Sequence, residues 1–303
     1  MTAVTDRPGV ADAGAPPAPP ASGGPGPERP RRRRGRLKAA TGGVGPLGLG
    51  LASLWISVIV LLPLAALTVK SVSGGLGGFW EAVTAPAALG SLLVTIGVSV
   101  VVALINVVMG TLVAWVLVRD DFPGKGFVNA VIDLPFALPT IVASIVMLGL
   151  YGPASPIDLD LSATKPGLIV ALTFVTLPFV VRSVQPVLIE VDREVEEAAA
   201  SLGASNVTIF RRVVLPTLLP AVLSGGGLAF ARAIGEYGSV VLIGGNIPKD
   251  TQMASQYIQQ QIEIDRPVNA AAVSVALLLV SFATLFVLRV VAARSAAREE
   301  RAA

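Results

Sequence analysis

Two opposite charges lie in a long apolar stretch in the last third of the sequence. Arg232 and Glu236 belong to the run from residue 224 to 246, which is otherwise apolar and rich in glycine. They are four residues apart, so on a helix they share one face and can pair. A charged side chain at the centre of a bilayer costs about 3 kcal/mol. We therefore expect both side chains to face the interior of a helix bundle rather than lipid.

This charged pair is compatible with two roles. In a path for an anion, Arg232 would lower the barrier to entry, and Glu236 would keep the anion from being held too tightly. Alternatively, the two charges form a structural pair that locks the segment into the bundle. Three consecutive glycines precede them, which indicates a place where helices approach closely or unwind. The candidate translocation path therefore consists of Gly225, Gly226, Gly227, Arg232 and Glu236.

Composition disfavours most other chemistry. The chain has 303 residues, of which 53% are hydrophobic and 14% charged, and its mean hydropathy is +0.74. A soluble domain carries about 25% charged residues. The chain contains neither Cys nor His, so it lacks thiols and the commonest general base and metal ligand. An enzyme within the membrane is therefore the least favoured class, and we expect no metal or cofactor in this chain.

Six apolar runs are long enough to span a membrane and predict an all-α membrane protein. They cover about residues 47–69, 89–118, 127–151, 167–189, 214–245 and 270–292. With this assignment, eighteen Lys and Arg fall on the side of the N-terminus, four fall on the opposite side, and Arg232 lies within a span. The bias predicts a multi-pass protein of the cell membrane with both termini in the cytoplasm.

The same patterns divide the chain into three parts. Residues 1–46 are rich in Pro, Gly and Ala, which predicts a disordered cytoplasmic tail. The basic run at 31–38 directly precedes the first apolar run, so it favours a topology signal over a nucleic-acid site. Residues 47–292 form the predicted membrane domain, and residues 293–303 form a cytoplasmic C-terminal tail.

A polar interlude between the fourth and fifth apolar runs covers about residues 190–213, and we call it the elbow. Its first part is rich in the helix formers Glu and Ala, and Gly203 can take the left-handed conformation that ends a helix. Ser205 or Asn206 can then cap a second helix. We expect two short helices joined at a sharp corner on the cytoplasmic side. Their apolar side, suited to a partner, would be formed by Leu202, Val207, Ile209 and Phe210.

The spacing of residues in the elbow resembles the EAA loop of permease subunits in bacterial ATP-binding-cassette (ABC) importers. Glu-Ala-Ala is followed after three residues by Gly, and nine residues later comes an apolar residue, any residue, Leu and Pro. Val213 stands where the family most often has Ile. The resemblance implies the type I importer fold with six transmembrane helices. It also implies a coupling helix that docks on an ATPase subunit through Glu197, Ala198, Ala199, Gly203, Leu215 and Pro216.

The resemblance implies partners as well. A second, homologous permease would complete a heterodimer, two copies of a cytoplasmic ATPase would bind ATP and Mg²⁺, and an extracytoplasmic binding protein would deliver the substrate. The chain itself has no GxxxxGK[ST] phosphate-binding motif, so a nucleotide site has to come from another chain. Membrane lipid would surround the spans, and no nucleic acid is expected as a partner.

A second stretch narrows the resemblance. The residues from Phe230 to Ser239, followed by Gly245 to Pro248, are similar to the CysT-type permeases of sulfate and thiosulfate importers. Permeases for molybdate and tungstate share much of this pattern, commonly with Phe where this chain has Tyr237, and they are the nearest alternative. A stand-alone ion-coupled transporter is a further alternative, but it would not need the elbow as an ATPase dock. The likeness covers about residues 50–290.

Three further expectations concern single features. Prolines within the runs should break or kink the helices: Pro63, Pro135, Pro139, Pro178, Pro186, Pro216 and Pro220. The Pro135 and Pro139 region is either a gating hinge or an ordinary feature of membrane helices, and Asp133 beside it is expected to reach the membrane interface. The loop at 246–269 is rich in Gln and is expected to be solvated, with contact to an external binding protein as the alternative.

Overall fold

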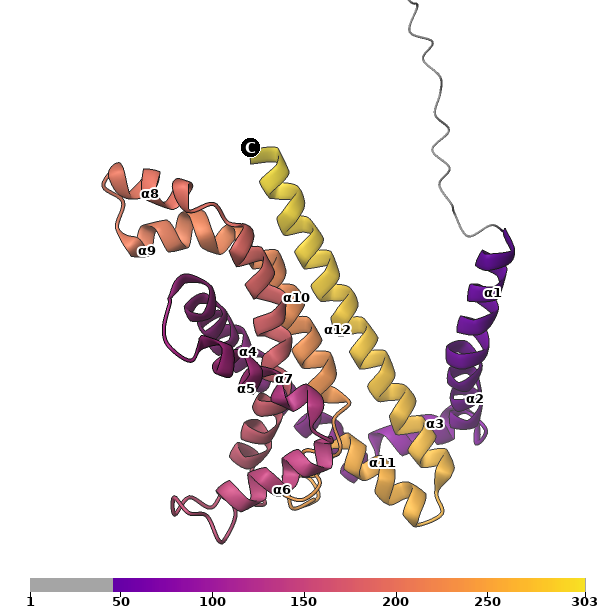
Figure 1. The fold of residues 1–303 in the computed structure, drawn as a ribbon. Helices are drawn as coiled ribbons and strands as arrows, with labels where there is room; N and C mark the ends of the chain where they lie inside the picture. The colour runs from indigo at the N-terminus through magenta and orange to yellow at the C-terminus, as the bar shows by residue number, and fades with distance from the viewer. Residues whose placement is uncertain (1–45, 303) are drawn as a thin grey trace, which may run out of the picture. The chain divides into compact units, whose positions relative to one another are not determined.

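The computed structural model of the chain describes residues 46–302, and this part contains helices and turns but no strands. The expected tail at 1–46 lies almost entirely outside the described residues. Figure 1 shows the order of the helices. They are α1 (Pro46–Ile56), α2 (Leu62–Ser71), α3 (Gly75–Thr84), α4 (Pro86–Arg119), α5 (Lys125–Ala137), α6 (Thr140–Tyr151), α7 (Lys165–Glu190), α8 (Arg193–Ser201), α9 (Asn206–Ile209), α10 (Leu215–Ile234), α11 (Ala254–Glu263) and α12 (Pro267–Ala302).

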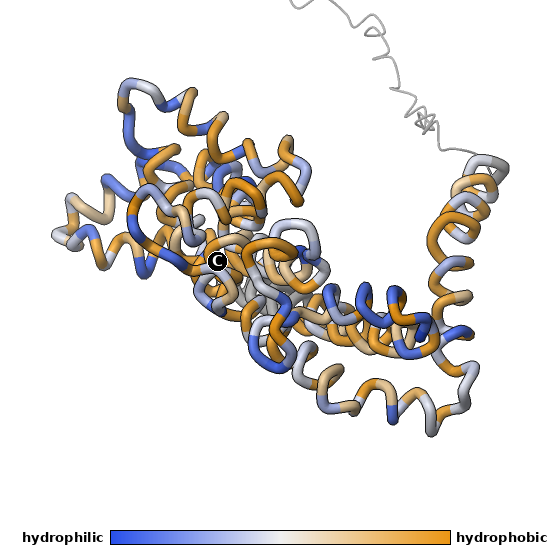
Figure 2. Tube along the Cα trace, turned by 90° about the horizontal axis from the view of Figure 1, so that it is seen from below, coloured by the Kyte–Doolittle hydropathy of each residue, from blue (hydrophilic) through white to orange (hydrophobic). Residues whose placement is uncertain are grey.

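Five continuous helical segments in the described part are long and apolar enough to cross a membrane. They are Gly48–Ser71, Pro86–Arg119, Lys165–Glu190, Asn206–Ile234 and Pro267–Val287. A sixth span is obtained if α5 and α6 are counted together. The all-α membrane fold predicted from the sequence is thereby confirmed, and Figure 2 shows hydrophobic residues along most of these helices.

The third predicted span, 127–151, is not one straight helix. Helices α5 and α6 are bent by 116° at the residues between them. Leu138 there is extended, with φ −82° and ψ 133°, as expected for a residue that precedes a proline. The segment after α10 packs against the start of α6 at this break. Gly238 lies so close to Thr140 that an added Cβ would be only 2.1 Å from Oγ1 of Thr140.

The fifth predicted span, 214–245, ends earlier than expected. Helix α10 stops at Ile234, and residues 238–246 form turns. Gly235 is the residue that follows the helix. The backbone then changes direction, and the N–H groups of Leu242 and Ile243 donate to the Ser144 hydroxyl of α6 at 3.1 and 3.4 Å. An apolar run rich in Gly therefore forms turns that pack against α6 instead of the last turns of a helix.

Prolines have three different effects in this chain. Pro178 and Pro186 lie within continuous α7, and Pro220 lies within continuous α10, so these three prolines do not break their helices. Pro63 and Pro216 each follow a π-turn, Ser57–Leu61 and Phe210–Val214. A π-turn is wider than an α-helical turn and leaves room for the proline ring against the preceding turn. Pro135 lies inside α5, and of these seven prolines only Pro139 lies at a sharp break, the one between α5 and α6.

Helices α4, α7 and α10 pack against one another and contain the largest cluster of buried apolar side chains. The fully buried members on α7 are Val180, Val181, Val184 and Leu188. Close approach is possible because small residues face α7: a Cβ on Gly110 of α4 would lie 2.8 Å from Cβ of Val180. Small residues at contacts are the usual means of packing helices in membranes. This three-helix core supports the elbow at one end of α7 and α10.

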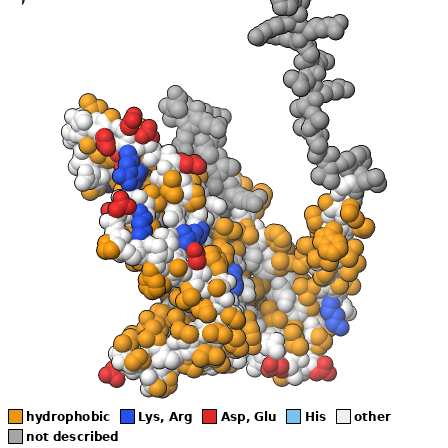
Figure 3. Space-filling view, viewed as in Figure 1, with side chains coloured by type: hydrophobic (Ala, Val, Ile, Leu, Met, Phe, Trp, Pro, Cys, Tyr) orange, Lys and Arg blue, Asp and Glu red, His pale blue; other side chains and the backbone are white. Residues whose placement is uncertain are grey.

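Helix α12 packs against α10, α11 and α2, and in Figure 1 it lies alongside α10. A second buried cluster joins α3, α4, α11 and α12 through side chains that include Ala82, Leu92, Tyr257 and Val273. Charged side chains gather around α8 and α9 in Figure 3, next to surfaces that are mainly hydrophobic. The elbow is therefore one of the charged parts of a mainly hydrophobic face.

Candidate functional site

The elbow has the local structure expected from the sequence. Asp192 caps α8 by accepting a hydrogen bond from the Glu194 N–H at 2.9 Å. After Ser201 the chain turns through Gly203, whose φ is +85°. The N–H groups of Gly203 and Ala204 donate to the carbonyls of Ala200 and Ala199 at 2.9 and 3.1 Å. This pair of bonds is the Schellman motif that ends many helices.

The second arm begins at Ser205, whose hydroxyl accepts a hydrogen bond from the Thr208 N–H at 3.4 Å and caps α9. The chain then passes through the π-turn Phe210–Val214 into α10. Leu215 and Pro216, the last two residues of the predicted coupling set, lie at the start of α10 and are half-buried. They therefore belong to the junction between the elbow and α10 rather than to its exposed surface.

The predicted apolar side of the elbow divides into two parts. Leu202 is 89% exposed, and Val207 is also exposed. Ile209 is buried, and Phe210 packs edge to face on Trp115 of α4, with the ring centroids 5.4 Å apart. The outer surface combines Leu202 and Val207 with exposed residues of the predicted coupling set, namely Glu197, Ala198 and Gly203, whereas Ala199 is half-buried. That surface offers both apolar and charged contacts.

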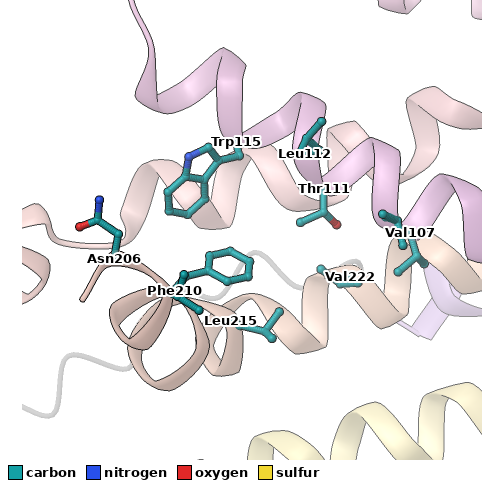
Figure 4. A pocket seen from close by; sticks show the side chains of 10 residues that line it. Val107, Thr111, Leu112, Trp115, Asn206, Phe210, Leu215 and Val222 are labelled. Carbon is teal, nitrogen blue, oxygen red and sulfur yellow. The ribbon is translucent and has the colours of Figure 1, made fainter. Parts of the chain in front are cut away.

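An apolar groove of about 570 Å³ lies between α4 and the second arm of the elbow. Figure 4 shows Trp115, Leu112 and Val107 on the α4 side and Phe210, Leu215 and Val222 on the other. Thr111 lines this groove, and its buried hydroxyl has no hydrogen-bond partner among the described residues. The groove therefore lies between two helices of the core, α4 and α10, and extends along the second arm of the elbow.

Arg232 and Glu236 form the predicted ion pair. Their surroundings differ, because the Glu236 side chain is 2% exposed and the Arg232 side chain is 35% exposed. Glu236 lies just beyond the end of α10, and its carboxylate accepts a hydrogen bond from the Ser239 N–H at 2.8 Å. The ion pair thus joins Arg232 in the last turn of α10 to Glu236 beyond the helix end. The sequence predicts one uninterrupted helix that carries both residues.

The three glycines lie within continuous α10, so they permit close packing and do not unwind the helix. A Cβ on Gly225 would lie 2.9 Å from Cα of Val180 on α7, and one on Gly226 would lie 2.6 Å from Cγ2 of Val107 on α4. Gly227 is buried as well. The glycines are thus packing positions between α10 and its two main neighbours.

The Gln-rich loop is not simply solvated, and that expectation is wrong for three of its five glutamines. Gln252, Gln256 and Gln261 are buried, whereas Gln259 and Gln260 are exposed. The reason is that residues 254–263 form α11, which packs against α4 and α12. The Ala254 N–H donates to the Thr95 hydroxyl of α4 at 2.7 Å. Burial also raises the pKa of the Tyr257 phenol on this helix.

A small polar cavity of about 190 Å³ lies between α11 and the turns that follow α10. Its walls carry Tyr237, Val241, Asn246, Gln256, Gln259, Gln260 and Glu263. The carboxamide oxygen of Gln256 accepts a hydrogen bond from the Met253 N–H at 2.9 Å, and its nitrogen has no partner among the described residues. Tyr237 in the cavity wall directly follows Glu236 of the ion pair in the sequence.

One charged contact could not be predicted from the sequence. Arg182 of α7 donates from Nε and Nη2 to the two carboxylate oxygens of Asp133 on α5, at 2.7 and 2.6 Å. It also donates to the side chain and the backbone carbonyl of Asn129, at 3.1 Å each. That Asp133 also reaches the membrane interface stays a prediction, and its side chain is 48% exposed. The sequence indicated this contact only by placing one acidic and one basic residue in separate apolar runs.

The comparisons with known proteins agree with this geometry. A bacterial ABC transporter that imports alginate has a chain of the same fold, with a TM-score of 0.68 at 15% identity over 81% of this chain and 93% of that one. A chain of the methionine ABC transporter MetNI has a TM-score of 0.53 at 20% identity, and the match covers 68% of this chain and 95% of that one. The chain therefore has the fold of the membrane subunits of ABC importers.

The family assignment is narrower than the fold. The model of the binding-protein-dependent transport system inner membrane component matches residues 106–297, and the chain belongs to this family. It is 45% identical over 238 residues to the sulfate transport system permease protein CysT of Synechocystis, covering 75% of this chain and 83% of that one. It is also 41% identical over 239 residues to the CysT proteins of Salmonella typhimurium and Escherichia coli. Each of these two matches covers 76% of this chain and 86% of the relative.

Proposed function

We propose that this chain is the permease subunit of an ATP-driven importer that carries sulfate, with thiosulfate as a second substrate, across the bacterial cell membrane. The observation that carries the proposal is the 45% identity to a sulfate permease over most of both chains. The three relatives named above all have sulfate in their names. This favours sulfate over molybdate or tungstate, which remain as the alternative outcome of the test.

The proposed partners follow from the same family. ATP would be hydrolysed by a pair of cytoplasmic ATPases, a second homologous permease would complete the path, and an extracytoplasmic protein would deliver the anion. A related alginate transporter has been solved in complex with a periplasmic protein, which supports the last partner. Both termini would lie in the cytoplasm, on the side of the elbow.

We propose that the elbow is the ATPase dock. Its support is the exposed outer surface, where Leu202 and Val207 lie beside Glu197 and Ala198. Apolar side chains with this exposure at the polar end of a membrane helix bundle are suited to a protein contact. Gly203 fixes the angle between the two arms through its positive φ. A movement of the ATPase pair would thus be passed to α7 and α10, the helices on either side of the elbow.

Arg232 and Glu236 have different proposed tasks. Glu236 is almost fully buried and holds both Arg232 and the Ser239 N–H, so it positions the turn after α10. Arg232 keeps about a third of its side chain exposed and is the group available to meet an anion. Replacement Arg232→Gln should abolish uptake while the subunits still assemble. Loss of assembly would instead assign Arg232 a purely structural role.

Uptake of labelled sulfate tests the function directly. Cells that lack this gene and any second sulfate importer are compared with the same cells carrying the restored gene. We expect uptake to return on restoration and to be reduced by unlabelled thiosulfate but little by molybdate. If sulfate uptake does not return whereas molybdate uptake does, the substrate assignment is wrong and the molybdate alternative holds.

A further inference from the structure

The elbow is attached to α4 as well as to α7 and α10. We infer that an ion pair, Arg119 with Glu196, together with the ring contact of Trp115 with Phe210, forms a strut that makes α4 move with the elbow. This inference rests on the proposed role of the elbow as the ATPase dock. It adds Arg119 and Glu196 as positioning residues for coupling, neither of which belongs to the EAA spacing.

The strut has one contact on each arm of the elbow. Arg119 is the last residue of α4, and its Nη2 pairs with a carboxylate oxygen of Glu196 in the first turn of α8. Trp115, one helical turn earlier, meets Phe210 in the π-turn of the second arm with an interplanar angle of 80°. Figure 4 shows these two rings facing each other from α4 and the elbow.

The two contacts are also joined to each other. The guanidinium carbon of Arg119 lies 5.6 Å from the centroid of the Trp115 ring, a geometry in which the cation is attracted to the ring face. Arg119 therefore contacts the carboxylate of one arm and the indole that supports the other. A rotation of either arm alone would break one of these contacts.

Burial distinguishes this pair from the other charges nearby. The side chains of Arg119 and Glu196 are 10% and 21% exposed, whereas Glu194 and Glu197 on the same helix are exposed. Arg119 at the end of a span would be solvated if it served only to anchor the helix at the headgroups. Instead its Nε is buried and has no partner among the described residues. Such a buried charge depends on its one carboxylate partner.

The position of α4 gives the strut its effect. Helix α4 packs along both α7 and α10, and its Val107 contacts α10 at the glycine triplet. A displacement of α8 by a docked ATPase would therefore reach the packing around Gly226 through α4 as well as through the chain. All three helices of the core would then move together, and the strut would set how much of the movement α4 receives.

Charge exchange tests the strut in the assembled transporter. Glu196→Arg and Arg119→Glu are compared singly and together, in proteoliposomes that hold both permeases, the ATPase and the binding protein. We expect each single change to lower sulfate uptake at least ten-fold while the ATPase still copurifies and hydrolyses ATP. The double exchange should recover at least a third of wild-type uptake. Glu196→Gln provides a milder change if a single reversal prevents folding.

The matched control is the ion pair between Asp121, in the loop that follows α4, and half-buried Lys125 at the start of α5. The pair spans 3.2 Å, and the Asp121 side chain is 98% exposed. Asp121→Lys should leave uptake within two-fold of the wild type. Normal uptake in Glu196→Arg, or no recovery in the double exchange, would overturn the strut.

A second measurement does not depend on which anion is carried. Spin labels are attached at Leu104→Cys on α4 and Leu279→Cys on α12, both exposed positions in a chain without other cysteines. We expect trapped ATP to change the distance between the labels in the wild-type background but not with Glu196→Arg. No change in the wild-type background would overturn the strut. Absent sulfate uptake with a normal distance change would overturn only the substrate.

Discussion

Single residues decide how closely the core helices approach. At Gly225 the backbone of α7 is so near that a methyl group would meet Cα of Val180 and Cβ of Ser183, both at 2.9 Å. A backbone atom cannot move aside as the end of a long side chain can. The helix must therefore shift as a whole when this position is enlarged.

Gly225→Ala should accordingly destabilise the protein by about 1–3 kcal/mol, the usual cost of overfilling a packed core. The measurement is the thermal unfolding midpoint of the purified protein in detergent. Gly97→Ala is the control, because no atom lies within 4 Å of a Cβ at Gly97 in α4. Equal midpoints for the two variants would contradict the packing role.

The bond between α5 and α7 depends on the shape of one side chain. Arg182 uses two nitrogens for Asp133 and also reaches Asn129. Lys has a single ammonium group and cannot reproduce this bidentate geometry. Arg182→Lys should therefore lower the free energy of unfolding by about 1–2 kcal/mol. Arg211→Lys, at an exposed position, should change it by less than about 0.5 kcal/mol, and an equal loss in both variants would count against the contact.

At the scale of elements, the direction of the elbow depends on one left-handed residue. Gly203 has a φ of +85°, yet a Cβ there would meet no atom within 4 Å. Its conformation, rather than lack of space, therefore requires glycine. An L-residue in this conformation costs about 1–2 kcal/mol, and a β-branched residue is the least tolerant whereas Asn is among the most tolerant.

Gly203→Val should therefore lower uptake strongly because the two arms no longer meet at the same angle. Gly203→Asn should retain most of it. The measurement is labelled sulfate uptake, together with the amount of ATPase that copurifies and the amount of permease in the membrane. Equal uptake in both variants would show that the angle at Gly203 is not needed for coupling.

The elbow could be predicted from the sequence because its signals act locally. Gly203 and Ser205 form hydrogen bonds with residues no more than five positions away. The break at Leu138 was partly predictable from its prolines, but its 116° bend also involves Gly238 and Ser144 contacts with a distant segment. Proline alone is a poor guide, since Pro178 and Pro220 lie in unbroken helices.

Features with distant partners had no local signal. Arg182 and Asp133 are 49 positions apart, and Glu196 finds Arg119 77 positions away. The burial of Gln252 and Gln256 depends on the packing of α11 against α4 and α12. Polar side chains such as these are normally assigned to solvent from sequence alone, and only the assembled helices supply the partners that allow them inside.

At the scale of the whole molecule, the family and the all-α membrane fold were predictable from motif spacing and hydropathy, and the six predicted spans compare with five or six in the described residues. The orientation in the membrane remains a prediction. It rests on the unequal distribution of Lys and Arg on the two sides. The proposed importer requires the elbow to be cytoplasmic, because ATP is available only there.

The absence of cysteine makes this orientation directly measurable. Single changes Ser22→Cys and Ser201→Cys should react with a membrane-impermeant maleimide only after the cells are opened. Asp158→Cys and Asp265→Cys, in the loops after α6 and α11, should react in intact cells. Labelling of Ser201→Cys in intact cells would reverse the orientation and rule out the elbow as an ATPase dock.

The π-turn at Phe210–Val214 makes the number of residues, and not only their identity, part of the design of the elbow. Leu215 donates its N–H to the Phe210 carbonyl five positions back, so the turn holds one residue more than an α-helical turn. An α-helix rotates by about 100° per residue. Loss of one residue here would restore a regular helix and turn the elbow by that angle about α10. Deletions in this turn should therefore be tolerated far less than substitutions. Natural variants should keep the number of residues in the turn even where the residue types change.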